Sequence, residues 1–203
     1  MPDPNFYIES PRLFLSYLIA DNPKHCQLIT DLYSSPSFVA AEGRTGVDTP
    51  ADAYRFISGR SNSLLARLGY GMYLCSLKTE SNKLEDAIPV GAITLIRGDE
   101  TQEGEVAYTV PDVGFAIVDR EMGKGYATEG AKAVIKYAIE TLGLEGVLGF
   151  TGPENLASQR VLEKAGLEYR GDRKLAAFGG SVSRVYALSG MKDLKEYNIA
   201  DNV

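Results

Sequence analysis

The chain has 203 residues, which at roughly 150 residues per domain corresponds to about one domain. Its 44% hydrophobic and 24% charged residues are typical of a folded globular protein and exclude disorder as the main state. The net charge of -6 disfavours a nucleic-acid-binding protein, which needs clustered positive charge. Because His25 is the only histidine, and Cys26 and Cys75 lie far apart, we expect no metal site and two buried, reduced thiols in a cytoplasmic protein.

The first half of the chain alternates strand-forming and helix-forming stretches. Residues 8–17 are rich in strand formers, and the apolar stretch at residues 13–20 is far shorter than the ~20 residues of a membrane-spanning helix. We therefore expect a first strand of the folded domain rather than a membrane or export segment. The elements predicted to follow are a helix from Asn22 to about Tyr33 that stops at Ser34-Ser35-Pro36, a loop over residues 43–50, and a helix over residues 51–68 with Thr49 as its N-cap.

Strands dominate the second half of the chain. Residues 70–78 and 88–97 flank a polar loop, which indicates an antiparallel pair. The elements predicted after the acidic loop at residues 98–105 are a strand over 110–118, a helix over 125–142, a strand over 147–150, a helix over 155–165, and strands over 167–175 and 183–188. No repeat or interdomain linker is visible, so we predict a single α+β domain over residues 1–203, with a mixed sheet of about seven strands and about four helices.

The strand at residues 110–118 leads into the next helix through a turn with glycines in alternate positions, Gly123 and Gly125. The first N–H groups of a helix have no intrahelical partner, and the helix dipole places partial positive charge there. Without Cβ atoms, the backbone at the two glycines can approach an anion closely. Residues 120–127 therefore predict a pyrophosphate cradle, although a plain strand-to-helix turn would use glycine in the same way.

Two other nucleotide-binding turns do not fit this segment. A P-loop needs a glycine where Val118 stands and Ser or Thr where Gly125 stands. A dinucleotide-binding fingerprint needs a third glycine where Thr128 stands, within repeated βαβ units that are absent here. The remaining match is the Arg/Gln-x-x-Gly-x-Gly/Ala turn of coenzyme A-dependent N-acetyltransferases, read here as Arg120-Glu-Met-Gly123-Lys-Gly125.

A second block supports this match, because Asn155-Leu-Ala-Ser158 is followed by Leu162-Glu-Lys-Ala-Gly166. With these motifs, the chain resembles the GNAT superfamily, and within it the Rim-type branch that includes ribosomal-protein N-terminal alanine acetyltransferases. The resemblance covers nearly the whole chain in the right order. It implies two adjacent parallel strands, ending near Val118 and Phe150, that splay apart and hold acyl-CoA, with the core of that site at about residues 110–170.

The resemblance also implies which residues bind each part of acetyl-CoA. The thioester would lie against Ala116, Ile117 and Val118, where a backbone N–H would bond the oxyanion formed on attack. Asn155 and Ser158 would contact the pantetheine arm. The residues that would bind the pyrophosphate are Arg120, Met122, Gly123, Lys124, Gly125, Tyr126 and Ala127.

Acetyl transfer to an amine also needs a base for the amine and a proton for the departing thiolate. Many relatives carry a glutamate in the strand before the glycine turn, and Asp112 occupies that position here as the expected base. Glu103 and Glu105 in the acidic loop are the alternatives. The tyrosine that serves many relatives as the acid is absent, since Leu162 stands in its place, which leaves Ser158 as the acid or as a coenzyme contact.

The resemblance implies an acetyl-CoA-dependent N-acetyltransferase that acts on a primary amine, either a protein N-terminus or a small molecule. The alternative is a non-catalytic acyl-CoA-binding or sensing module on the same fold, which the missing tyrosine and the shorter carboxylate keep open. A nucleotide-dependent kinase is a more distant alternative. We expect no nucleic acid and no membrane among the partners, and a chain that is a monomer or a homodimer.

Overall fold

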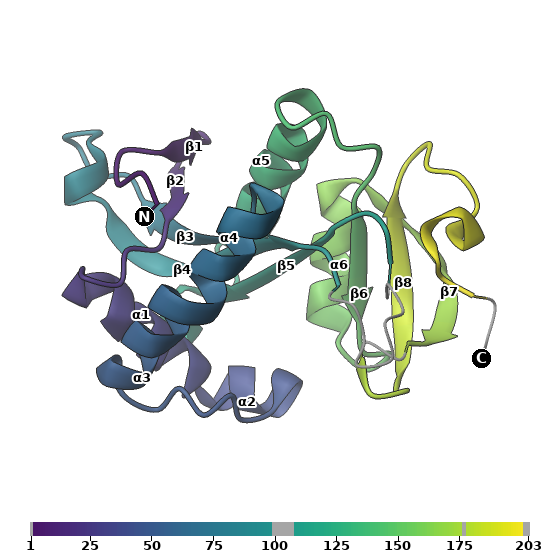
Figure 1. The fold of residues 1–203 in the computed structure, drawn as a ribbon, viewed down its shortest axis with the longest axis horizontal. Coiled ribbons are helices and arrows are strands. Elements are labelled where there is room, and N and C mark those ends of the chain that lie inside the picture. Colours follow the sequence, from purple (N-terminus) through teal and green to yellow (C-terminus); the bar gives the residue numbers. More distant parts are fainter. Residues whose placement is uncertain (1, 99–107, 176–177, 201–203) are drawn as a thin grey trace. The chain divides into compact units, whose positions relative to one another are not determined.

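The computed structural model describes residues 2–98, 108–175 and 178–200. In these residues eight strands form one sheet in the order β1-β2-β3-β4-β5-β6-β8-β7 (Figure 1). The predicted α+β class with a mixed sheet is confirmed. The chain packs as two compact units, one made of Met1–Thr94 and Phe115–Ala133 and the other of Leu95–Gly114 and Val134–Val203. The boundaries of a single domain at residues 1 and 203 stay a prediction.

The first unit combines antiparallel strands with helices. Its strands are β1 (Tyr7–Glu9), β2 (Leu13–Tyr17), β3 (Met72–Leu77), most of β4 (Ile88–Ile96) and the end of β5 (Asp112–Ile117). Its helices are α1 (Pro23–Tyr33), α2 (Pro36–Glu42), α3 (Pro50–Phe56), α4 (Asn62–Leu68) and the start of α5 (Tyr126–Glu140). β1, β2, β3 and β4 pair with one another in antiparallel order, as predicted for the pair β3 and β4.

The prediction of one strand over residues 8–17 is wrong, because this segment folds as a hairpin of β1 and β2. The backbone N–H of Ser10 bonds the carbonyl of Leu13 at 3.0 Å and closes the turn. Pro11 has no N–H to donate, so the strand cannot continue through it as a paired strand. The extra strand raises the number in the sheet above the seven that we expected, and it places Ser10 and Arg12 in a turn.

Helix α2 is a second difference from the prediction, which treated Ser34-Ser35-Pro36 as a stop followed by a loop. The hydroxyl of Ser35 accepts a hydrogen bond from the N–H of Phe38 at 3.3 Å, and Pro36 follows at the first helical position. A Ser cap followed by proline is a signal for a helix start as well as for a stop. Ser35-Pro36 therefore marks the start of α2 as well as the end of α1.

Residues 51–68 are helical, as predicted, but they do not form one continuous α-helix. Thr49 caps it, and Asp52 completes a capping box, since each side chain bonds the backbone N–H of the other residue. A π-helical segment, Ile57–Ser61, separates α3 from α4. Gly69 ends α4 with a φ of 77°, at the predicted end of the helical segment.

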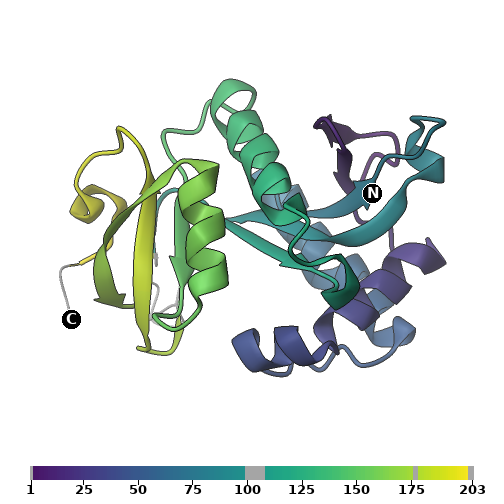
Figure 2. The same ribbon diagram turned by 180° about the vertical axis from the view of Figure 1, so that it is seen from behind.

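Neighbouring residues of β4 show how the first unit is layered. Ala92 is buried in a cluster with Leu28 of α1 and Ile57 at the end of α3. The next residue, Ile93, faces α5, where a Cβ added to Gly130 would lie 2.8 Å from its side chain. Because successive side chains of a strand point to opposite faces, α1 and α3 cover one face of these strands and α5 covers the other, as Figures 1 and 2 show from two sides.

The second unit contains β6 (Leu148–Thr151), α6 (Leu156–Ala165), β7 (Leu167–Lys174) and β8 (Val182–Leu188), with a short 3-10 helix at Leu194–Tyr197. β8 is antiparallel to both β6 and β7. The expected parallel pairing of β5 with β6 is present, and its register comprises the pair Asp112↔Leu148. Leu148 lies in the buried cluster with Tyr197 and Ile199, whereas Gly149 faces α6.

Candidate active site

The glycine turn joins β5 to α5 within the first unit. A short 3-10 helix, Asp119–Glu121, follows β5, and α5 begins at Tyr126. The N–H of Glu129 donates to the carbonyl of Gly125 at 3.0 Å. The N–H groups of residues 126–128 therefore come before the first i→i−4 hydrogen bond of α5 and stay outside the intrahelical ladder. These are the groups that make a helix N-terminus a site for anions.

Both glycines of the turn have a backbone conformation that residues with a side chain rarely adopt. The φ angle is +76° at Gly123 and +85° at Gly125. A Cβ on Gly123 would meet no atom within 4 Å, so its conformation rather than crowding requires glycine there. Both residues are exposed. An exposed turn of this kind at the start of a helix fits a phosphate group.

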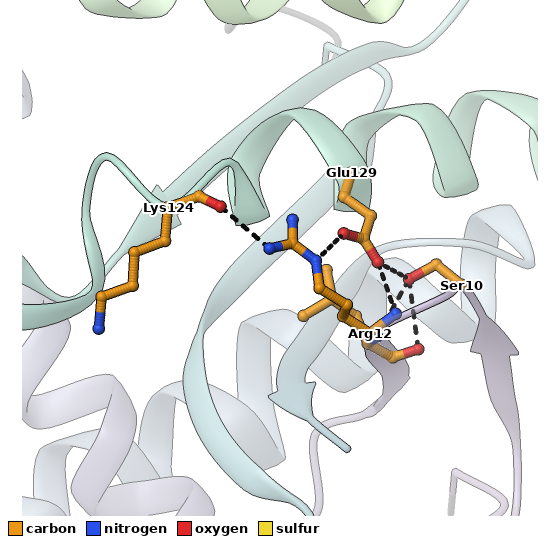
Figure 3. Close-up of polar contacts among 5 residues, drawn as sticks. Ser10, Arg12, Lys124 and Glu129 are labelled. Carbon is orange, nitrogen blue, oxygen red and sulfur yellow. Dashed lines mark hydrogen bonds and ion pairs between the residues drawn. The ribbon is translucent and has the colours of Figure 1, made fainter. Parts of the chain in front are cut away.

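Two side chains from the β1–β2 turn hold the beginning of α5 (Figure 3). The backbone N–H and Nε of Arg12 donate to the two carboxylate oxygens of Glu129, both at 2.7 Å. Ser10 Oγ donates to the same carboxylate at 2.8 Å. Arg12 Nη1 donates to the carbonyl of Lys124 at 3.2 Å, and the guanidinium lies 4.8 Å from the centre of the Tyr126 ring. Sequence patterns do not reveal this network, because Arg12 and Glu129 lie 117 residues apart along the chain.

The charges around the turn are paired. Burial by itself raises the pKa of Glu129, but the hydrogen bonds from the Arg12 backbone, the Ser10 hydroxyl and the Arg12 guanidinium outweigh burial, and the pKa is lowered. Lys124 Nζ lies 2.8 Å from Glu121 Oε2, and this hydrogen bond raises the pKa of Lys124. Glu129 is therefore ionised at neutral pH and adds a negative charge to the first turn of α5.

The loop before the turn is also tied to a helix of the same unit. Ser37 of α2 donates a hydrogen bond from its hydroxyl to the carboxylate of Asp119. At the end of β5, the N–H of Val118 donates to the carbonyl of Val90 at 2.9 Å. Since successive N–H groups of a strand point to opposite edges, the N–H of Ile117 points away from β4.

Asp112, the predicted base, is the first residue of β5 and belongs to the second unit. Its carboxylate accepts a hydrogen bond from the hydroxyl of Tyr108, a residue that is 4% exposed. Burial raises the pKa of Asp112 to about 6, although the hydrogen bond from Tyr108 lowers it. A carboxylate with a pKa near the working pH is suited to general base catalysis. The alternatives, Glu103 and Glu105, lie outside the described residues.

Asp112 and Ile117 stand at opposite ends of β5. At about 3.3 Å per residue, five steps along a strand separate the two backbones by roughly 16 Å. The Asp112 carboxylate therefore does not reach atoms at Ile117 directly.

Asn155 and Ser158 lie at the start of α6 in the second unit. Asn155 Oδ1 accepts a hydrogen bond from the N–H of Ser158 at 3.0 Å, which makes Asn155 the N-cap of α6. Among the described residues, no group forms a hydrogen bond with Ser158 Oγ. The cap is thus supplied by Asn155 alone, and helix capping does not explain the serine at position 158.

Leu162 occupies the place of the tyrosine that serves other members of the resembled family as an acid. It is 1% exposed and packs over β6, where a Cβ on Gly149 would lie 2.5 Å from its Cδ2. The position is therefore filled by a core side chain with no proton to donate. Gly149 leaves the space that Leu162 needs.

His25 has a structural partner in the first unit. Its Nδ1 accepts a hydrogen bond from the N–H of Ile19 at 3.0 Å, and burial lowers its pKa to about 4. It borders a groove of about 620 Å³ that β1, β2, β3 and α1 line together with the loop before β4. Cys26 and Cys75 are buried free thiols. Over residues 2–98, 108–175 and 178–200, no group of His, Cys, Asp and Glu could hold a metal ion, and no helix is long and apolar enough to cross a membrane.

Comparisons with known proteins agree with the motifs. A family model described as an acetyltransferase (GNAT) domain matches residues 12–168. An FsC-acetyl coenzyme A-N(2)-transacetylase of Aspergillus fumigatus is 41% identical over 58 residues, which are 29% of this chain and only 25% of that relative. The matched segment thus spans a quarter of the relative's length.

Two solved structures show the likeness of the fold. A GNAT-family acetyltransferase from Bacillus anthracis has a TM-score of 0.65 and 23% identity, with 90% of this chain and 98% of that chain covered. RimL, a ribosomal L7/L12 alpha-N-protein acetyltransferase in complex with coenzyme A, has a TM-score of 0.66 and 16% identity, with 90% and 97% covered. At these identities the likeness shows the fold.

Proposed function

The chain belongs to the GNAT acetyltransferase family, and from this premise we propose that it transfers the acetyl group of acetyl-CoA directly to a primary amine. The family and the relatives that carry the name N-acetyltransferase identify it as an acyltransferase. The observation that carries the proposed coenzyme is the exposed turn at Gly123 and Gly125, which opens into the N-terminus of α5. The alternative of a non-catalytic acyl-CoA-binding module is not favoured, because the relatives are acetyltransferases.

Acetyl-CoA supplies an acetyl group already activated as a thioester. We assign the diphosphate to the turn, because its backbone N–H groups and the dipole of α5 both favour negative charge. Asn155 and Ser158 are the proposed contacts of the pantetheine arm. The residues proposed for the diphosphate are Arg120, Met122, Gly123, Lys124, Gly125, Tyr126 and Ala127.

Ile117 is the proposed donor to the oxyanion that forms when the amine attacks. Of the neighbours Ala116, Ile117 and Val118, Val118 already donates its N–H to Val90. The N–H of Ile117 points to the other edge of β5 and is free of that bond. One backbone donor aimed at a developing oxyanion is typically worth about 3–4 kcal/mol in the transition state.

Asp112 is the proposed proton acceptor, through water, and Ser158 the proposed donor to the thiolate or a contact of the coenzyme. How much a general base contributes to catalysis depends on the pKa of the acceptor amine. An α-amine with a pKa near 7.8 costs about 1 kcal/mol to deprotonate at pH 7, whereas a lysine-type amine costs about 4.6 kcal/mol. With a pKa of about 6, Asp112 is ionised at pH 7 and can take the proton.

The class of amine is the part of the proposal that the relatives leave open. The name of RimL refers to the α-amino group of a ribosomal protein, and the name of the Aspergillus fumigatus relative refers to FsC. We therefore propose a primary amine that is either a protein N-terminus or a small molecule. We also propose a cytoplasmic location, which the buried free thiols of Cys26 and Cys75 support, and a chain that acts as a monomer or a homodimer.

A screen of acceptors tests this function. The protein is incubated with acetyl-CoA and a panel of peptides with free N-termini, amino acids, polyamines and aminoglycosides, while thiol release is followed and products are identified by mass spectrometry. We expect thiol release that depends on one class of amine and a product that carries one acetyl group. Tight binding of coenzyme A without turnover on any amine would contradict the proposal and favour the binding module.

A further inference from the structure

We propose that Arg12 positions the diphosphate site of the coenzyme, by holding the backbone of the glycine turn and by adding a positive charge that cancels the net negative charge of the turn. This inference rests on the proposed use of acetyl-CoA. It assigns a role in coenzyme binding to the β1–β2 hairpin, which lies outside the segment at residues 110–170 that the sequence analysis took as the core of the site. The residues involved all belong to the first unit.

The contacts of Arg12 reach three consecutive residues of the turn and the helix start. Nη1 donates to the carbonyl of Lys124 at 3.2 Å (Figure 3). The guanidinium also lies over the ring of Tyr126. Nη2 lies 3.5 Å from the place that a Cβ on Gly125 would occupy. Since the guanidinium is rigid and planar, these contacts fix the Lys124 carbonyl and bring a full positive charge next to the Gly125 backbone.

Glu129 explains why this guanidinium stays in place. Its carboxylate, in the first turn of α5, takes both the backbone N–H and the Nε of Arg12, and the Ser10 hydroxyl completes the set. The Glu129 side chain is 15% exposed, whereas that of Arg12 is 49% exposed. The less exposed carboxylate thus anchors one side of the guanidinium, while the rest of the group stays accessible to a ligand in solvent.

The charge balance shows what the turn would lack without Arg12. Residues 119–129 carry three carboxylates, Asp119, Glu121 and Glu129, and two basic side chains, Arg120 and Lys124. By themselves they would therefore present a net negative charge to a diphosphate. With Arg12 included, three basic side chains balance the three carboxylates. The partial positive charge at the N-terminus of α5 is then no longer offset by a net negative charge of the side chains.

The test compares a ligand that carries the diphosphate with one that does not. Binding of coenzyme A to the full chain is measured by titration calorimetry, and turnover is measured with acetyl-CoA and with S-acetylpantetheine, which lacks the diphosphate. For Arg12→Ala we expect the Kd for coenzyme A to rise by about tenfold. We expect kcat/KM with S-acetylpantetheine to stay within about twofold of the wild-type value, a difference that a general loss of structure would not produce.

Two further variants separate charge from loss of structure. Arg12→Lys keeps the charge without the planar fork, so it should recover part of the lost affinity. The double variant Arg12→Ala with Glu129→Gln also removes the negative charge that Arg12→Ala leaves without its ion-pair partner, so it should bind coenzyme A more tightly than Arg12→Ala alone. If Arg12→Ala does not fold, Arg12→Lys still tests the proposal. Its Kd for coenzyme A must then be higher than the wild-type Kd, while binding stays measurable.

Lys78, the residue after β3, provides a matched control because its side chain contacts both strands of the β1–β2 hairpin. Its Nζ pairs with Glu9 of β1 at 2.6 Å and lies 4.9 Å from the centre of the Phe14 ring of β2, so it also combines an ion pair with a cation–π contact. It makes no contact with the turn among the described residues. We expect Lys78→Ala to bind coenzyme A as the wild type does.

The outcomes distinguish this inference from the function on which it rests. Failure of the wild-type protein to bind coenzyme A at all would overturn the proposed function before any variant is compared. Normal binding by the wild type together with an Arg12→Ala Kd within about twofold of it would overturn the role of Arg12 alone. An equal loss of kcat/KM with acetyl-CoA and S-acetylpantetheine would also overturn it, because the effect would then be unrelated to the diphosphate.

Discussion

Tyr108, a buried residue, donates its hydroxyl hydrogen to the carboxylate of the half-buried Asp112, so the residue proposed as the base carries a hydrogen bond that favours its ionised form. Burial pushes the pKa of Asp112 up, and the hydrogen bond pulls it back to about 6. The ionisation of Asp112 is therefore set by two opposed effects, and a change at Tyr108 removes one of them.

Tyr108→Phe should raise the pKa of Asp112 further, because it deletes the hydrogen bond and leaves the burial. If Asp112 accepts the proton of the amine, the acidic limb of the profile of kcat/KM against pH moves to higher pH in this variant. In Asp112→Asn the limb disappears, and activity at the optimum falls. A limb at the same pH in wild type and Tyr108→Phe would show that another group, such as Glu103 or Glu105, is the base.

The raised pKa of Asp112 also predicts how stability depends on pH. The folded state holds the proton more tightly than the unfolded chain, so the free energy of unfolding falls as pH rises from about 4 to about 6. The difference between 3.8 and about 6 corresponds to roughly 3 kcal/mol at neutral pH. In urea unfolding between pH 4 and 7, the wild type should lose this stability relative to Asp112→Asn as pH rises, since the opposite contribution of His25 is common to both proteins. An equal slope in both proteins would contradict the assignment.

Ser158→Ala tests whether the hydroxyl acts on the thiolate or only contacts the coenzyme. Because Asn155 caps α6, we expect no loss of thermal stability in Ser158→Ala. A fall in kcat at unchanged affinity for coenzyme A identifies the acid, and a parallel fall in affinity identifies a contact. Asn155→Ala is the control for the cap and should cost about 1 kcal/mol of stability, whereas Asn155→Asp keeps an acceptor and should cost less.

Gly123→Ala and Gly125→Ala should weaken binding of coenzyme A, because each forces a Cβ into a positive φ and so disturbs the turn. The expected loss of stability is about 1–2 kcal/mol for each. Gly46 is a matched control in a different loop, with a φ of +78° and no atom within 4 Å of an added Cβ. Gly46→Ala should lose similar stability in a thermal melt and bind coenzyme A normally. Weakened binding in all three variants would point to a general effect of stability.

His25→Asn should make the protein less sensitive to acid. The pKa of His25 is lowered to about 4 in the folded state, so the unfolded chain binds more protons between pH 6.5 and 4, and stability falls as pH falls through this range. The loss attributable to His25 is roughly 3 kcal/mol below pH 4. The amide oxygen of Asn can accept the hydrogen bond of Ile19, so the variant should match the wild type at pH 7 and exceed its stability near pH 4 in chemical unfolding. Identical pH profiles would count against the assignment.

The motif around Gly123 and the cap at Asn155 could be predicted from the sequence because both depend on neighbours within a few residues. A strand end, two glycines and a helix start follow one another along the chain, and an Asn three residues before Ser158 reaches its N–H by local geometry. The split of residues 8–17 into a hairpin was also encoded locally, by Pro11. The strand-forming residues around Pro11 favour one continuous strand, whereas the missing N–H donor of Pro11 interrupts it.

By itself, the sequence determined the α+β class, the family, the glycine turn and the replacement of the usual tyrosine by Leu162, since each of these depends on residue types and their spacing. The tertiary structure alone decided which charges meet. Arg12 reaches Glu129 across 117 residues, and Tyr108, a member of a buried cluster, bonds the half-buried Asp112. Hydrogen bonds and burial depend on distances in space, and the spacing of residues along a chain does not fix those distances until the strands have paired and the helices have packed on them.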